Sequence, residues 1–215
     1  MIDLHIHSIF SDGELIPSEI VSRAKMKGYR ALAFTDHVDT SNLEFVLRSM
    51  VKVAKDLSLE TGVTILPGVE ITHVPPTLIP GLIREARERG ALIVIVHGET
   101  IVEPVPPGTN REAIAAGADI LAHPGLISEE DALLAAKNDV LLELTSRWGH
   151  SYTNGHVVAV ARKTKARMIF NTDAHSPGDF LGREEAWNIL RGAGLDPDMI
   201  STVFDNAEEL IQKRS

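Results

Sequence analysis

Seven short apolar runs recur along the chain, and six of its nine histidines lie at or just past the ends of these runs. The runs cover residues 2–6, 31–35, 63–71, 91–96, 119–122, 140–144 and 168–171. Short runs of this kind, often β-branched, are typical of buried parallel strands. Side chains at the ends of strands that are far apart in the sequence can meet only if those ends converge. This pattern therefore limits the fold more than any other feature of the sequence.

Helical stretches lie between most of the runs. We expect helices at residues 17–27, 42–59, 78–89, 110–116, 129–136, 154–165, 184–192 and 206–213. Strands alternating with helices, without a linker-like segment, predict an α/β fold and a single domain over residues 1–215. An open, doubly wound sheet is the alternative to a barrel. The barrel is favoured because the carboxyl ends of its strands meet at one rim, whereas an open sheet spreads them along a line.

The residues at the ends of the runs are of the types that bind divalent metals. They are His5, His7, Asp12, His37, Glu70, His97, His123, Asp173 and His175. Any one of them could be an isolated residue with a single hydrogen bond, but nine together favour a metal centre. The chain has no cysteine, so imidazole and carboxylate must supply the ligands, which suits zinc, manganese or iron.

Composition narrows the range of partners and locations. The formal net charge of −9 argues against a protein that binds nucleic acid through its general surface. The N-terminus lacks a basic stretch followed by a long apolar run, and no apolar run approaches the length of a membrane span. We therefore expect a cytoplasmic protein with no membrane partner. Divalent cations among the three carboxylates would make the site locally cationic, so an anionic substrate remains possible.

In combination, the motifs at the run ends resemble those of the PHP family, named for polymerase and histidinol phosphatase. The matching motifs are His5-Ile6-His7 with Ser11-Asp12-Gly13, Thr35-Asp36-His37, Gly68-Val69-Glu70, His97, His123-Pro124-Gly125 and Asp173-Ala174-His175. The resemblance covers essentially the full chain. It implies a distorted, seven-stranded (β/α)7 TIM-like barrel with two or three divalent metal ions at the carboxyl ends of its strands.

The resemblance also implies how the nine residues divide among three metal sites. The expected sets are His5, His7, Glu70 and Asp173 for the first site, Glu70, His97 and His123 for the second, and Asp12, His37 and His175 for the third. The family varies in residue type and spacing at Asp12, which could instead be a turn residue. We expect Glu70, Asp173 and His175 to be catalytic. Asp3 and Asp36 could orient imidazoles, or they could be solvated loop carboxylates.

Closely spaced divalent ions activate water and neutralise phosphate oxygens. The expected reaction is hydrolysis of a small phosphate monoester by a metal-bridging hydroxide, as in the histidinol-phosphate phosphatases of the family, with a small phosphorylated metabolite as substrate. A PHP-type exonuclease or nucleotide phosphatase is one alternative, although the net negative charge argues against nucleic acid as a partner. Stacking platforms for such substrates would have to come from Trp148, Tyr152 or Phe180. A non-catalytic, metal-stabilised scaffold is the other alternative.

Two arginines are candidates to bind the substrate phosphate, because guanidinium offers paired donors. Arg147 follows the sixth run and Arg183 follows the seventh. Each could instead be a surface residue with an exposed partner. His150 and His156 could donate a proton to the leaving group, but a helix-capping or surface role is expected for each. We expect His73 to be structural.

Overall fold

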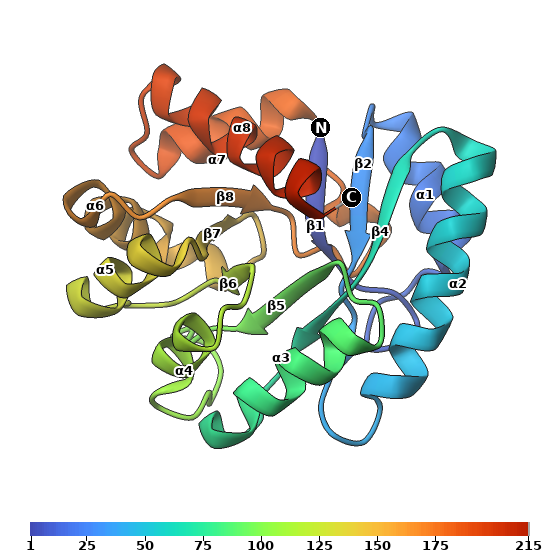
Figure 1. The fold of residues 1–215 in the computed structure, drawn as a ribbon. Helices are drawn as coiled ribbons and strands as arrows, with labels where there is room; N and C mark the ends of the chain where they lie inside the picture. Colours follow the sequence, from blue (N-terminus) through green and yellow to red (C-terminus); the bar gives the residue numbers. More distant parts are fainter. Residues whose placement is uncertain (215) are drawn as a thin grey trace.

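Parallel strands in the order β1-β2-β4-β5-β6-β7-β8 form a nearly closed barrel in the computed structural model, which describes residues 1–214 (Figure 1). The strands are β1 (Ile2–Ile6), β2 (Ala31–Phe34), β4 (Thr64–Ile71), β5 (Ile93–His97), β6 (Ile120–Ala122), β7 (Leu141–Thr145) and β8 (Met168–Asn171). A further two-residue strand, β3 (His37–Val38), pairs with β4. The predicted TIM-like α/β barrel is confirmed, and β3 is the strand that the apolar runs did not reveal.

Side chains help to close the barrel between β1 and β8. The backbone contacts there include one bridge, from Ile6 to Ala174. Next to it, the Leu4 amide donates to Asn171 Oδ1 at 2.8 Å, and the Thr172 amide donates to Asp3 Oδ1 at 3.2 Å. Burial raises the pKa of Asp3 to about 7. Asp3 is thus part of the closure and accepts from backbone and hydroxyl groups, not from an imidazole.

Helices surround the strands. They are α1 (Pro17–Met26), α2 (Leu43–Thr61), α3 (Ile79–Glu88), α4 (Thr109–Ala115), α5 (Glu129–Asn138), α6 (Asn154–Thr164), α7 (Arg183–Gly192) and α8 (Pro197–Arg214). The strands are buried on both faces, which explains their nearly continuous apolar sequences. None of the helices within residues 1–214 has both the length and the apolar character needed to cross a membrane.

The last helix is longer than predicted: α8 begins at Pro197, whereas the sequence pattern indicated a start at residue 206. The Asp196 carboxylate accepts from the Met199 amide at 2.9 Å, and proline is favoured in the first turn of a helix. Ala207 and Leu210 of α8 pack with the side chains inside the barrel. The helix therefore covers the amino-terminal end of the barrel and leaves the carboxyl end open.

Candidate metal centre

The nine predicted metal-binding residues lie together at the carboxyl ends of the strands. Glu70 is at the middle of the cluster and is completely buried on β4. Its Oε1 lies 3.4 Å from His5 Nε2 and 3.7 Å from His123 Nε2. Its Oε2 lies 3.7 Å from His7 Nε2 and 2.7 Å from His37 Nδ1. The two oxygens thus face different imidazoles, as a carboxylate shared by two ions requires.

Asp173 contacts three of the imidazoles that surround Glu70. Its Oδ1 lies 3.2 Å from His7 Nε2 and 3.6 Å from His5 Nε2, and its Oδ2 lies 3.7 Å from His123 Nε2. Asp173 has φ 55° and His123 has φ 25°, values that are uncommon for residues with a side chain. Such backbone conformations persist where the surrounding structure imposes them, often at functional sites. The first predicted ligand set is therefore brought together, with His123 beside it.

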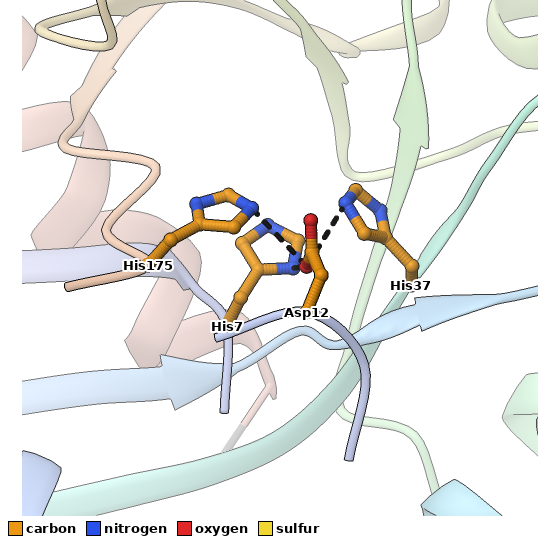
Figure 2. Close-up of side chains that lie close together, drawn as sticks. All are labelled: His7, Asp12, His37 and His175. Carbon is orange, nitrogen blue, oxygen red and sulfur yellow. Dashed lines mark ion pairs between the residues drawn. The ribbon is translucent and has the colours of Figure 1, made fainter. Parts of the chain in front are cut away.

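Asp12 joins a second group of imidazoles at the rim (Figure 2). Its Oδ1 lies 3.4 Å from His37 Nε2, 3.3 Å from His175 Nε2 and 3.9 Å from His7 Nδ1. The three residues predicted for the third site therefore meet, and His7 lies with them. These four residues can offer one ligand atom each, all within 4.8 Å of one another. The position of Asp12 favours a ligand over a turn residue.

The loop that carries Asp12 is held by Asp36. Asp36 Oδ1 accepts from the Ser8 amide at 2.7 Å and from the Ser11 hydroxyl at 2.8 Å. A Cβ on Gly13 would lie 2.4 Å from the His7 carbonyl oxygen. The loop can therefore approach the His7 backbone this closely only because Gly13 has no side chain. Asp36 therefore positions a loop, and this buried carboxylate neither orients an imidazole nor faces solvent.

Glu143 is a functional residue that the sequence reasoning missed. It is completely buried on β7, with Oε1 2.8 Å from His5 Nδ1. The Asn171 amide group donates to the same oxygen at 2.8 Å, and the His123 backbone amide donates to Oε2 at 3.1 Å. A carboxylate that accepts from one nitrogen of a metal-binding histidine fixes its tautomer and orientation. The sequence did contain one signal for this role, since Glu143 is the single charged residue within the apolar run that forms β7.

Several nitrogen and oxygen atoms of the cluster are buried without a hydrogen-bond partner. They are His5 Nε2, both ring nitrogens of His7, Glu70 Oε1 and His123 Nδ1. Buried polar atoms are normally paired, so these atoms need either a partner or an ion. A divalent cation would satisfy them, and imidazole with carboxylate is a donor set that zinc, manganese and iron accept. The residues present thus fit the metals that the sequence pattern predicts.

The electrostatics of the cluster favour the metal-binding forms of two carboxylates and two imidazoles, whereas neighbouring carboxylates, acting against burial, raise the pKa values of His5, His37 and His97. Burial opposes the ionised forms of Glu70 and Asp173, but the neighbouring imidazoles, His5 foremost, outweigh it and hold both pKa values well below the usual range. Burial, followed by positive charge on nearby imidazoles, lowers the pKa of His7 to about 3 and that of His123 well below normal. Ionised carboxylates and neutral imidazoles are the forms that bind cations.

Of the two arginines predicted to bind phosphate, the structure brings one to the centre. Arg147 lines a cavity of about 60 Å³ together with several of the predicted ligands, and its Nη1 lies 3.4 Å from Asp179 Oδ2. Arg183 instead stacks over the Phe204 ring at 4.4 Å and lies beside Met1, at the amino-terminal end of β1. We therefore correct the assignment of Arg183, because it lies at the opposite end of the barrel from the cluster.

The three remaining histidines occupy different environments. His156 Nε2 lies 2.9 Å from the Ile127 carbonyl oxygen, which agrees with a surface or capping role. His150 is buried, with its ring stacked on that of His123. His73 packs edge-on against His97 and contacts Glu103. The surface role expected for His150 is therefore wrong, and Glu103 was missed, because their loops meet the strand ends only in the folded chain.

With the geometry in place, comparison with known proteins identifies the family. The sequence model described as the PHP domain matches residues 3–180. The chain belongs to the PHP family. It is 42% identical over 214 residues to the uncharacterized protein MJ1295 of Methanocaldococcus jannaschii, covering 98% of each chain. It is 27% identical to the probable phosphatase YcdX of Escherichia coli K12, covering 94% of this chain and 89% of YcdX.

A solved structure supports the fold. A chain in the structure of archaeal ribonuclease P with mature tRNA superimposes with a TM-score of 0.76. The match covers 100% of this chain and 91% of that one, at 17% sequence identity. At this identity the likeness shows a shared architecture. Together with the family match, it confirms the barrel that the sequence predicts.

Proposed function

We propose that this PHP protein is a metal-dependent phosphoesterase whose substrate is a small phosphorylated metabolite, and that it hydrolyses the phosphate monoester of that molecule. The observation that carries the proposal is the position of Arg147, which lines the same cavity as His123, His175 and Asp173. A cationic clamp beside a metal-binding cluster suits a phosphate group. The PHP family and a phosphatase-named relative support phosphoesterase chemistry in general.

The chain's own residues would prepare the centre for this reaction. Bound divalent ions would supply an activated water and neutralise the phosphate oxygens. Glu70 and Asp173 would help to hold those ions, and Glu143 would keep His5 in the orientation that points Nε2 at both carboxylates. His175 would line the cavity beside the bound phosphate group. Arg147 would hold the phosphate oxygens through its guanidinium group.

Release of phosphate from p-nitrophenyl phosphate tests this proposal. We expect activity with Mn²⁺ or Zn²⁺, loss of activity on chelation, recovery when metal is restored, and loss in a His123→Ala variant. Histidinol phosphate belongs in the substrate panel because of the family resemblance. Absence of phosphate release with every metal and substrate would refute the phosphatase and favour a metal-stabilised scaffold.

One observation favours a second candidate, a nucleotide phosphatase or exonuclease. Trp148, which directly follows Arg147 in the chain, is 83% exposed and Tyr152 is 60% exposed. Their rings meet edge-on with centroids 6.0 Å apart. Exposed aromatic rings near a phosphate site can stack on nucleobases. Phe180 offers no such surface, since it is buried against Tyr29. Activity on mononucleotides or short single strands, but not on other phosphate monoesters, would establish this candidate.

A further inference from the structure

Two loops meet over one side of the metal centre. The first follows β5 and contains Thr100 and Glu103, and the second follows β7 and contains His150. The family resemblance assigns His97 and His123 to a site with Glu70. In the structure, His97, His123 and His150 can offer one ligand atom each within 4.8 Å of one another, a grouping that does not include Glu70. His123 keeps a contact with Glu70, at 3.7 Å, but the ligand group around His97 differs from the one expected.

His150 is held in this position from both sides. It is 7% exposed, and its ring stacks on that of His123 with centroids 4.0 Å apart and planes 14° apart. Its Nδ1 lies 2.8 Å from the Thr100 hydroxyl, within hydrogen-bond distance. That contact uses one ring nitrogen and leaves Nε2 directed at Glu103, 3.5 Å from Oε1. A buried imidazole with one nitrogen engaged and the other facing its neighbours is typical of a metal ligand.

Glu103 reaches the same place from the other loop. Its Oε2 lies 3.0 Å from His97 Nε2, while its Oε1 faces His150. The loop is anchored by Glu99, whose Oε1 accepts from the Gly108 amide at 3.0 Å and from the Asn110 amide at 2.9 Å. The Glu103 carboxylate thus lies between the rings of His97 and His150, and it lines the same small cavity as His123.

We propose that His97, His123, His150 and Glu103 form one divalent-cation site of this chain, with three imidazole nitrogens and one carboxylate oxygen as ligands. This inference rests on the proposed metal-dependent function and names the ligands of one part of the same centre. Four ligands of this kind suit the tetrahedral preference of Zn²⁺ and of Co²⁺ used in its place. Glu103, whose side chain is 38% exposed, is the ligand that a surface loop supplies.

Cobalt titration tests the proposal without any substrate. The metal-depleted protein is titrated with Co²⁺ while the bound metal is counted and the visible absorption recorded. We expect His150→Gln and Glu103→Gln each to weaken one class of bound Co²⁺ by about ten-fold or more and to change its visible absorption, since even outer partners of a metal site are worth about 10–100-fold in affinity. The remaining classes of bound Co²⁺ should be unaffected.

Two control variants match the test variants. His156→Gln alters a histidine from the same part of the chain that contacts the Ile127 carbonyl. Glu130→Gln alters an exposed carboxylate that pairs with Arg111. Both should bind Co²⁺ like the unaltered protein. Circular dichroism of the metal-depleted variants checks the fold, and His150→Asn serves as a second variant if His150→Gln does not fold.

Unchanged Co²⁺ affinity and spectra in both test variants would overturn the proposal and return the second site to Glu70, His97 and His123. A change in only one of the two variants would also overturn the four-ligand site. Phosphatase activity separates this inference from the proposed function. If the protein has no phosphatase activity but the test variants bind Co²⁺ more weakly, the four-ligand site stands and the proposed function fails. If the protein is active but the test variants bind Co²⁺ normally, the proposed function stands and the four-ligand site fails.

Discussion

At the scale of single residues, the centre depends on side chains that never reach solvent. Glu143 shares its oxygens among the His5 imidazole, the His123 backbone amide and Asn171, so it fixes one imidazole and the backbone that carries another. Arg147 has the opposite character, since it is partly exposed at the entrance. Glu143 therefore orients residues of the cluster from the interior, whereas Arg147 is placed to contact a bound phosphate group.

We expect Glu143→Gln to weaken metal binding by about 10–100-fold, because an amide is a poorer acceptor for the His5 N–H and no longer fixes its orientation. Titration with Mn²⁺ or Zn²⁺, followed by calorimetry, measures the change. Glu130→Gln, at an exposed helix position, is the control. Equal affinities in the two variants would show that Glu143 has no such role.

We expect Arg147→Ala to lower kcat/KM for phosphate monoesters by about 10–100-fold, which corresponds to the roughly 1.5–3 kcal/mol of a hydrogen bond to a charged group. Arg147→Lys should recover part of the loss, since a lysine keeps the charge without the paired donors. Arg183→Ala is the matched control, because Arg183 lies at the other end of the barrel. Steady-state kinetics would contradict the assignment if Arg147→Ala and Arg183→Ala behaved alike.

At the scale of elements, the strands set the positions of the ligands, and short loops complete the groups. Strand β3 is only two residues long, yet its pairing places His37 directly opposite Glu70 on β4. The loop of residues 8–13 brings Asp12 over the same region because Asp36 accepts from Ser8 and Ser11. A loop held by one carboxylate can be weakened without disturbing the strands.

We expect Asp36→Ala to lower the free energy of unfolding by about 1–3 kcal/mol, because the buried Ser8 amide loses its acceptor. It should also weaken the metal group around Asp12 and His175 more than the group around Glu70. Urea denaturation and metal counting measure the two effects. Asp56→Ala, which removes an exposed carboxylate on α2, should change neither. Uniform loss of all bound metal would argue against a separately anchored loop.

At the scale of the whole molecule, the two ends of the barrel have different tasks. The carboxyl end carries the metal-binding residues, and the amino end is covered by α8. Asp119 fastens α8 there: the carboxylate is buried and accepts from Arg214 Nε at 2.9 Å and from the Val94 amide at 2.7 Å. Arg87 approaches the same carboxylate from α3. Stability and chemistry can thus be altered separately.

We expect Asp119→Asn to lower the free energy of unfolding by about 1.5–3 kcal/mol, the range for hydrogen bonds to charged groups, since both arginines lose their anionic partner. Metal affinity should be unchanged, because the cluster lies at the other end. Urea denaturation in excess metal measures the first quantity and calorimetry the second. Asp205→Asn, exposed on α8, is the control. A large loss of metal affinity in Asp119→Asn would show that the two ends are coupled.

The sequence by itself determined every strand except β3, nearly all of the helices and the nine residues of the cluster. These features are readable because apolar runs, helix signals and ligands next to strand ends are local patterns, and because parallel strands in a barrel bring such ends together. The family resemblance reinforced the same positions. The start of α8 was missed, although Asp196 and Pro197 are a local signal for it.

Only the tertiary structure decided which residues surround that cluster. Glu143 acts through partners 138 and 20 residues away in the chain, and the segment after β8 carries Arg183 back to the amino end before α7 begins. Likewise, Glu103 and His150 meet because two loops cross the same rim. Strand register and the paths of loops determine where a side chain points, and both result from packing of the whole chain rather than from any local pattern.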